Sequence, residues 1–212
     1  MGTLALDIGA TKIAIALLDE SHHITARSQV ASNTSNPIWP QLSEAIIQIS
    51  HGIEVDRIGI ASAGPIDRNQ GTISPVNIAQ WREFPISLEI SKLFPGRPIG
   101  LLGDCTAVAL AENKLGAGKG TNNMLAVVVS TGIGGGLVIN GSAFHGDTGN
   151  AALFGHHSIG FESDVVCDCG RTGCLETFAR GPKMVEHAKS LGWSAGEDFV
   201  ALAQSARDGD SK

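Results

Sequence analysis

Three cysteines and two histidines lie close together in the chain, in an arrangement that suits a metal ion. The cysteines are Cys167, Cys169 and Cys174, and His156 and His157 precede them. Structural Zn²⁺ takes four Cys or His ligands in a tetrahedron, and the glycines between the cysteines permit tight turns. Three unrelated free cysteines are the alternative; a redox pair is disfavoured because the thiols do not open a helix after a strand. The spacing predicts a closed structural zinc site, with one of the two histidines as the fourth ligand.

Two glycine-containing turns between apolar segments could bind phosphate groups. The first spans residues 7–12 (DIGATK) and the second spans residues 130–136 (STGIGGG). Glycine lets backbone N–H groups approach an anion, and the carboxylate of Asp7 could hold a hydrated Mg²⁺. Each segment could instead be an ordinary glycine-rich hairpin. The second turn is not a P-loop, because no Gly-Lys-Ser/Thr follows, and it is not a dinucleotide-binding turn, because it leads into an apolar strand rather than a helix.

Asp104 follows an apolar strand and stands where a helix begins. A carboxylate in this place could accept the proton of an attacking hydroxyl group as a general base. It could instead cap the N-terminus of the helix, which is a common role for Asp. Spacing alone favours the capping role.

The segments that position these residues alternate between strands and helices. Apolar runs predict strands at 4–6, 13–18, 23–30, 58–61, 99–102, 125–129 and 137–139. Helical spacing predicts helices near 40–50, 86–93, 106–115, 182–191 and 197–207. Each half has a strand, a glycine turn and a return strand, which indicates two similar domains with a cleft between them. We place the domains at residues 1–118 and 119–212, with the boundary in the glycine-rich stretch 116–122.

Composition excludes several classes of partner. The chain has 212 residues, 27 glycines and a formal net charge of −6, with no long basic run. A nucleic acid or an anionic membrane surface is therefore disfavoured. The sequence contains no apolar run of about 18 residues that would span a bilayer. Because the first residues also lack the basic segment of a signal peptide, we expect a cytoplasmic protein.

Taken together, these motifs resemble the ROK family of bacterial repressors and sugar kinases. The matching stretches follow the family's order along nearly the whole chain, at 4–12, 59–65, 75–78, 103–112, 130–136, 149–156 and 167–176. The most specific of them is Cys-x-Cys-Gly-x-x-Gly-Cys-x-Glu at 167–176. The resemblance implies an α/β protein with the actin-like ATPase (ribonuclease H-like) fold, with two similar domains around a cleft and an incomplete second domain. It also implies ATP with Mg²⁺, a structural Zn²⁺, a sugar substrate and a homodimer.

The resemblance also assigns residues to roles. It implies that the catalytic base is Asp104. The first phosphate-binding turn would comprise Asp7, Gly9, Thr11 and Lys12, and the second Thr131, Gly132 and Gly134. The sugar hydroxyls would be bound by Asn77, Asp104, His156 and Glu176. The zinc ligands would be His156, Cys167, Cys169 and Cys174.

Three positions depart from the family pattern. Gly103 replaces an Asn that contacts the sugar, Leu153 replaces a Glu that binds it within Gly-Glu-x-Gly-His, and Ala10 replaces a Gly. Loss of a carboxylate at Leu153 should weaken recognition of an unmodified hexose, because a buried polar contact is lost. A more apolar wall suits an N-acyl group, so we expect a kinase for the 6-hydroxyl of an N-acylhexosamine, namely N-acetylmannosamine.

Other functions stay open at this point. A glucokinase or broader hexose kinase uses the same motifs. Family kinases are longer, so the chain is expected to be a fragment or the product of a shortened gene. An inactive truncated protein is therefore an alternative. A sugar-responsive regulator is disfavoured, because the family's repressors carry an N-terminal helix-turn-helix and here the first turn begins at Asp7.

Overall fold

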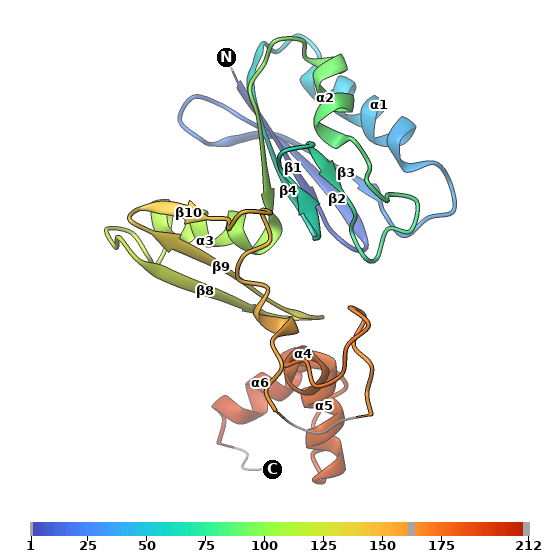
Figure 1. The fold of residues 1–212 in the computed structure, drawn as a ribbon, viewed down its shortest axis with the longest axis vertical. Helices are drawn as coiled ribbons and strands as arrows, with labels where there is room; N and C mark the ends of the chain where they lie inside the picture. The colour runs from blue at the N-terminus through green and yellow to red at the C-terminus, as the bar shows by residue number, and fades with distance from the viewer. Residues whose placement is uncertain (1, 161–163, 210–212) are drawn as a thin grey trace. The chain divides into compact units, whose positions relative to one another are not determined.

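The computed structural model describes residues 2–160 and 164–209, and within them the chain forms two compact units (Figure 1). Unit 1 comprises the residues up to Val108 together with Phe144–Ala151. Unit 2 comprises Ala109–Ala143 together with the residues from Ala152 onward. Residues 1 and 210–212, at the outer ends of the two predicted domains, lie outside the described residues. Among the described residues, no helix has both the length and the apolar character needed to cross a membrane.

Unit 1 is built on a five-stranded sheet with the strand order β3-β2-β1-β4-β7. The strands are β1 (Gly2–Ile8), β2 (Lys12–Leu18), β3 (Ile24–Ala31), β4 (Val55–Ser62) and β7 (Ile99–Gly103). The first three strands form an antiparallel meander, whereas β4 pairs in parallel with both β1 and β7. The carboxyl ends of β1, β4 and β7 therefore meet at one edge of the sheet.

One face of this sheet forms the main hydrophobic core. Alternate residues of β1 and β2 are buried, among them Leu6 and Ile15, which are paired directly in the register. The helices α1 (Ile38–Ser50) and α2 (Ile86–Leu93) contribute buried apolar residues to the same core, including Leu42 in α1. Burying each large aliphatic side chain contributes roughly 1.5–3 kcal/mol, so this face holds unit 1 together.

The other face of the sheet carries small side chains. Ala and Gly at alternating positions line a hollow of about 410 Å³, together with the start of α3 (Asp104–Leu115) at Ala107. Two further short strands, β5 (Ile66–Asp67) and β6 (Thr72–Ile73), form a hairpin. The Asn150 side chain accepts from the backbone N–H of Ile66 at 3.1 Å and donates to its carbonyl oxygen at 2.9 Å, which joins the segment 144–151 to unit 1.

Unit 2 contains a three-stranded sheet in the order β10-β9-β8, formed by β8 (Met124–Val129), β9 (Ile133–Ile139) and β10 (Ser142–Phe144). The short 3₁₀ helix η1 (Phe154–His156) follows, and then α4 (Glu176–Ala179), α5 (Gly181–Ser190) and α6 (Phe199–Arg207). Trp193 is buried between α5 and α6. The glycines of β9 have a packing role, because a Cβ atom added at Gly135 would overlap the ring of Phe154.

The strands and helices expected from periodicity are present, with bounds that differ by a few residues. Periodicity in the sequence does not predict β5, β6, β10, η1 or α4. These elements have two to four residues each, too few to show a repeating apolar pattern. They matter for the site, since η1 and α4 carry His156 and Glu176.

Candidate functional site

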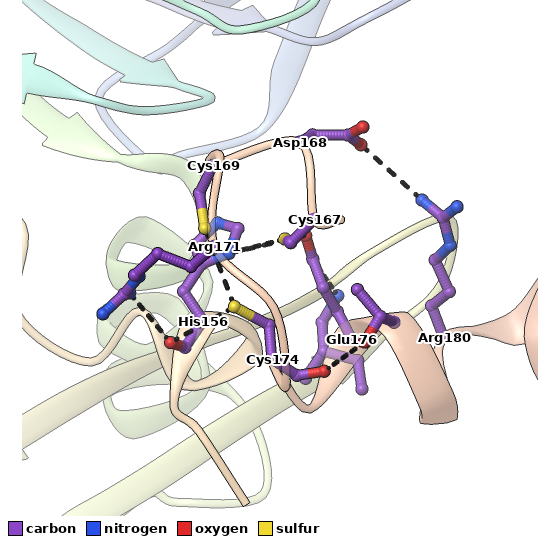
Figure 2. Close-up of polar contacts among 10 residues, drawn as sticks. His156, Cys167, Asp168, Cys169, Arg171, Cys174, Glu176 and Arg180 are labelled. Atoms are coloured by element: carbon purple, nitrogen blue, oxygen red, sulfur yellow. Dashed lines mark hydrogen bonds and ion pairs between the residues drawn. The ribbon is translucent and has the colours of Figure 1, made fainter. Parts of the chain in front are cut away.

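The predicted zinc ligands come together in unit 2. The ligand atoms of His156, Cys167, Cys169 and Cys174 all lie within 4.8 Å of one another, and Figure 2 shows these side chains gathered around one point. Cys169 Sγ lies 3.6 Å from Cys174 Sγ, and Cys167 Sγ lies 3.4 Å from His156 Nδ1. A zinc tetrahedron with Zn–S of about 2.3 Å and Zn–N of about 2.0 Å has ligand–ligand edges of roughly 3.5–3.8 Å. The donor set and its spacing therefore fit Zn²⁺.

Of the two candidate histidines, His156 belongs to the cluster. Its ring faces the thiols, whereas the ring of His157 packs edge-on against Phe154 with ring centroids 5.3 Å apart. The 3₁₀ turn of η1 separates the directions of these two consecutive side chains. Four protein ligands leave no open position on the ion, so a zinc ion here would brace the structure rather than bind substrate.

Tight turns bring the cysteines together. The backbone N–H of Cys167 donates to the carbonyl of Arg171 at 2.7 Å, and the N–H of Gly170 donates to the carbonyl of Cys167 at 2.8 Å. Gly170 has a φ of +86° and Gly173 a φ of +76°, in the left-handed region that favours glycine. The guanidinium of Arg171 then donates to the carbonyl of His156 at 3.0 Å (Figure 2). These bonds fix the loop that presents the three thiols.

The thiols of the cluster differ in acidity. Burial raises the pKa of Cys167 to about 12, and burial also raises the pKa of Cys174. Hydrogen bonding from Arg171, first through its backbone N–H, lowers the pKa of Cys169 to about 6. Zinc binds thiolates, so one ligand is ionised at neutral pH before binding and two must lose protons when a metal binds.

Glu176 joins the metal cluster to the second glycine turn. It is the first residue of α4 and is buried, with an exposed fraction of 9%. Its Oε1 lies 3.5 Å from His156 Nδ1 and 3.3 Å from Cys167 Sγ, and its Oε2 accepts a hydrogen bond from the Ile133 N–H at 3.3 Å. A Cβ atom added at Gly155 would overlap the carbonyl oxygen of Ile133. The cluster and the turn therefore form one packed body within unit 2.

The second glycine turn connects β8 to β9. Val129 pairs with Ile133, so residues 130–132 form the connection, and Thr131 is exposed at its tip. The N–H of Gly181, at the start of α5, donates to the carbonyl of Ser130 at 2.9 Å. Beside the turn lies a cavity of about 610 Å³. Its lining comprises Val129, Ser130, Thr131, Gly181, Pro182, Val185, Glu197, Asp198, Phe199 and Val200.

The first glycine turn lies in unit 1, between β1 and β2. The Gly9 N–H donates to the Lys12 carbonyl at 3.1 Å, and Ser32 Oγ donates to the Gly9 carbonyl at 2.8 Å. Ser32 also donates its backbone N–H to the Thr11 carbonyl at 3.1 Å. The side chains of Thr11 and Lys12 remain exposed. The turn is thus held on its inner side by Ser32, the residue that follows β3, and is open on its outer side.

Two carboxylates meet at one edge of the unit 1 sheet. In the sheet, Asp7 of β1 pairs with Ala61 of β4, and Ala61 pairs with Leu102 of β7. Asp104 follows Leu102 by two residues. The pKa of Asp7 is raised by burial and, secondly, by the negative charge of Asp104. A cation bound between two carboxylates relieves their mutual repulsion, so Asp7 is suited to hold the Mg²⁺ expected with ATP.

The hydrogen bond made by Asp104 is not that of an ordinary helix cap. Its Oδ1 accepts from the N–H of Cys105, the next residue, at 2.6 Å. A capping side chain accepts from the second or third N–H of the helix instead. The neighbouring Cys105 thiol stays protonated, because burial raises its pKa to about 12.

The remaining predicted positions lie on loops. Asn77 is exposed in a turn of unit 1. Leu153 precedes η1 in unit 2 and has an exposed fraction of 42%. Ala152, in the same segment, has a φ of +66°, a conformation that was not predicted. The sequence contains a signal for it, since Ala152 stands where the Gly-Glu-x-Gly-His pattern has its first Gly.

The family model described as "ROK family" matches residues 3–212, which is nearly the whole chain. The chain belongs to the ROK family. Members that it resembles include the glucokinase of Streptomyces coelicolor, 32% identical over 211 residues, with 98% of this chain and 66% of the relative covered. The N-acetylmannosamine kinase of Yersinia pestis is 34% identical over 212 residues, with 99% of this chain and 71% of the relative covered. The chain thus spans about two thirds of the length of these relatives.

Solved ROK structures share the fold. The ROK family glucokinase of Streptomyces griseus, in complex with glucose and AMPPNP, superposes with a TM-score of 0.79 at 31% identity, covering 100% of this chain and 72% of that protein. The ROK hexokinase of Thermus thermophilus gives 0.78 at 32% identity, covering 100% and 70%. The mixed α/β, actin-like ATPase fold predicted from the sequence is therefore confirmed for the part of the fold that this chain contains.

Proposed function

We propose that this ROK chain is the greater part of an ATP-dependent sugar kinase that phosphorylates the 6-hydroxyl of an N-acylhexosamine, with N-acetylmannosamine as the substrate. The observation that carries the proposal is the placement of Asp104 beside Asp7 at the carboxyl edge of the unit 1 sheet, within a family that includes sugar kinases. A base and a metal-binding carboxylate side by side are what phosphoryl transfer to a hydroxyl group requires.

In this mechanism, Asp104 accepts the proton of the 6-hydroxyl while the hydroxyl oxygen attacks the γ-phosphorus of ATP. The new O–P bond forms as the bond between the γ-phosphorus and the β–γ bridging oxygen breaks, and ADP leaves. Asp7 would hold the Mg²⁺, which supplies neutralising charge to the phosphates. The N–H donors of the turns around Gly9 and Gly132 would bind phosphate oxygens, with Thr11, Lys12, Thr131 and Gly134 as further contacts.

Asn77, His156 and Glu176 would bind sugar hydroxyls in addition to Asp104. The zinc held by His156 and the three cysteines would fix the loop that carries His156, so that its free ring nitrogen keeps one direction. Glu176 is already engaged by Ile133 and His156, and a sugar hydroxyl would add to these contacts.

The choice of sugar depends on Leu153. A leucine where family kinases have a sugar-binding Glu removes one acceptor for a hexose hydroxyl and leaves an apolar wall for an acetyl group. A glucokinase or hexose kinase is the second candidate, because glucokinase and N-acetylmannosamine kinase relatives are about equally similar, at 32% and 34% identity.

We further propose two similar domains, residues 1–118 and 119–212, the second of them incomplete. The strand orders support this proposal. The first three strands of unit 1 are ordered β3-β2-β1, and the three strands of unit 2 are ordered β10-β9-β8, which is the same arrangement. In both sheets a glycine turn connects the first strand to the second. The expected homodimer stays a prediction, for which light scattering on the purified protein is the test.

A direct assay separates the two substrate candidates. ADP release is measured with N-acetylmannosamine and glucose side by side, on this chain and on any longer polypeptide that contains it. A kcat/KM for N-acetylmannosamine at least tenfold above that for glucose supports the proposal. The reverse order would establish the hexose kinase alternative, and no turnover with either sugar would reject both.

A further inference from the structure

Asn77, one of the proposed sugar-binding residues of unit 1, stands in a loop made of two consecutive turns. The Ile78 N–H donates to the Pro75 carbonyl at 3.0 Å, and the Trp81 N–H donates to the Ile78 carbonyl at 2.9 Å. Ile78 and Trp81 are buried, with exposed fractions of 1% and 3%, whereas Asn77 is exposed. The loop is thus anchored by apolar side chains on its inner side and presents Asn77 on its outer side.

The guanidinium of Arg82 binds the backbone carbonyls of this loop. Its Nη1 donates to the carbonyl oxygens of Pro75 at 2.7 Å, Ile78 at 3.0 Å and Trp81 at 3.1 Å, and its Nη2 donates to that of Val76 at 3.1 Å. Two of these carbonyls, those of Val76 and Ile78, flank Asn77 directly. One side chain therefore restrains the backbone on both sides of Asn77.

Other side-chain contacts hold the C-terminal end of this loop. Gln80 Nε2 donates to the carbonyls of Thr34 at 2.7 Å and Asn36 at 3.0 Å. Trp81 stacks on Phe84, with ring centroids 4.5 Å apart and an interplanar angle of 5°. These contacts fix positions 80 and 81, three or more residues beyond Asn77.

We propose that Arg82 is a positioning residue for sugar recognition. It holds the backbone of the loop in one conformation, so the loop need not become ordered before the Asn77 amide binds a sugar hydroxyl. This inference rests on the proposed function, since it assumes that Asn77 contacts the sugar. An Arg suits the task because its planar guanidinium presents donors in several fixed directions, whereas a Lys ammonium is a single compact charge. Among the described residues, no other side chain donates a hydrogen bond to the carbonyls of Pro75, Val76 or Ile78.

The kinetic signature follows from where Asn77 acts. A contact made equally in the ground state and the transition state changes KM and leaves kcat nearly unchanged. For Arg82→Gln we expect the KM for the sugar to rise about tenfold, with kcat within about twofold and the KM for ATP unchanged. Arg82→Lys should lie between the wild type and Arg82→Gln.

The experiment pairs kinetics with hydrogen exchange. Arg97→Gln is the matched control, because Arg97 is also a unit 1 arginine, and its guanidinium pairs with Glu54 at 2.9 Å on the surface, away from the Asn77 loop. In the absence of sugar, the amides of Ile78 and Trp81 should exchange faster in Arg82→Gln than in the wild type or in Arg97→Gln. Thermal melting of all variants monitors global stability.

The outcomes separate this inference from the proposed function. If the wild type phosphorylates a sugar and Arg82→Gln has the same sugar KM, the positioning role is overturned while the kinase proposal stands. Unchanged exchange of the Ile78 and Trp81 amides overturns it as well. If the wild type neither binds nor phosphorylates a sugar, the proposed function fails, and the exchange data alone then report whether Arg82 holds the loop. A raised sugar KM together with faster exchange supports the inference.

Discussion

The carboxylate of Glu176 accepts a hydrogen bond from the backbone N–H of Ile133 at 3.3 Å, while its other oxygen lies 3.5 Å from the ring of His156. One buried side chain thus contacts both the glycine turn between β8 and β9 and a ligand of the metal cluster. Because both features contact Glu176, a change in the metal cluster should alter the conformation of the turn.

Replacing Glu176 tests this connection. In Glu176→Ala the Ile133 N–H loses its acceptor, so its amide should exchange faster, whereas Glu176→Gln keeps an acceptor oxygen and should exchange nearly as slowly as the wild type. Zinc affinity should also fall in Glu176→Ala, because the buried Glu176 side chain packs against the ligands His156 and Cys167 and its loss lets them shift. The control is Glu186→Ala, on the surface of α5, which should change neither quantity. Equal exchange of Ile133 in all variants would show that the contact does not hold the turn.

Zinc binding should release about two protons per ion at pH 7.5, because Cys167 and Cys174 are protonated in the metal-free protein while Cys169 is mostly ionised. Titration calorimetry in buffers of different ionisation enthalpy measures this number. Zinc affinity should decrease as the pH falls, because protons compete with the metal at Cys167 and Cys174, whose pKa values are raised. Release of no proton would mean that the thiols are ionised before the metal binds.

Zinc should also stabilise the fold. At a free concentration about 1,000 times the Kd, binding contributes about 4 kcal/mol, which corresponds to a rise in Tm of roughly 8–16 °C for a chain of this size. Chelation should lower the Tm by the same amount, and Cys174→Ser should remove the difference between the two conditions.

Ala152→Gly should stabilise the protein by about 0.5–1 kcal/mol, because Ala152 has a φ of +66°, a conformation that costs an L-residue with a Cβ about 1–2 kcal/mol. Ala151→Gly is the matched control. Ala151 does not have a positive φ, so the added flexibility of the unfolded chain should destabilise that variant. Denaturant unfolding measures both, and equal signs for the two substitutions would contradict the explanation.

Much of this architecture is visible in the sequence, for reasons that are local. Apolar runs interrupted at Gly9 and Gly132 define strand pairs, and the spacing of Cys167, Cys169 and Cys174 defines a metal loop. The contact between Glu176 and Ile133 joins residues far apart in the chain, and no local pattern indicates it. The hydrogen bonds from Arg82 to its loop cannot be predicted from the sequence either, because a single Arg forms no pattern and the positions of the backbone carbonyls are known only from the fold.

Leu153→Glu should shift the preference toward glucose. A carboxylate that accepts a hydrogen bond from a sugar hydroxyl is worth about 1–3 kcal/mol, so the ratio of kcat/KM for glucose to that for N-acetylmannosamine should rise roughly 10- to 100-fold. Leu191→Glu is the control, because Leu191 is a more exposed leucine of unit 2, at 61%, outside the predicted site. An unchanged ratio in Leu153→Glu would remove this position from substrate selection.

In the proposed mechanism, Asp104 is the base that takes the proton of the sugar hydroxyl. Its most direct test is the formation of sugar 6-phosphate by Asp104→Asn, followed by phosphorus NMR, with sugar binding measured by calorimetry on the same sample. Asp19→Asn, which alters a surface turn at the end of β2, is the control. We expect a loss of at least about 100-fold in phosphorylation for Asp104→Asn, with sugar binding retained and the control at the wild-type rate. Turnover by Asp104→Asn at the wild-type rate would contradict it.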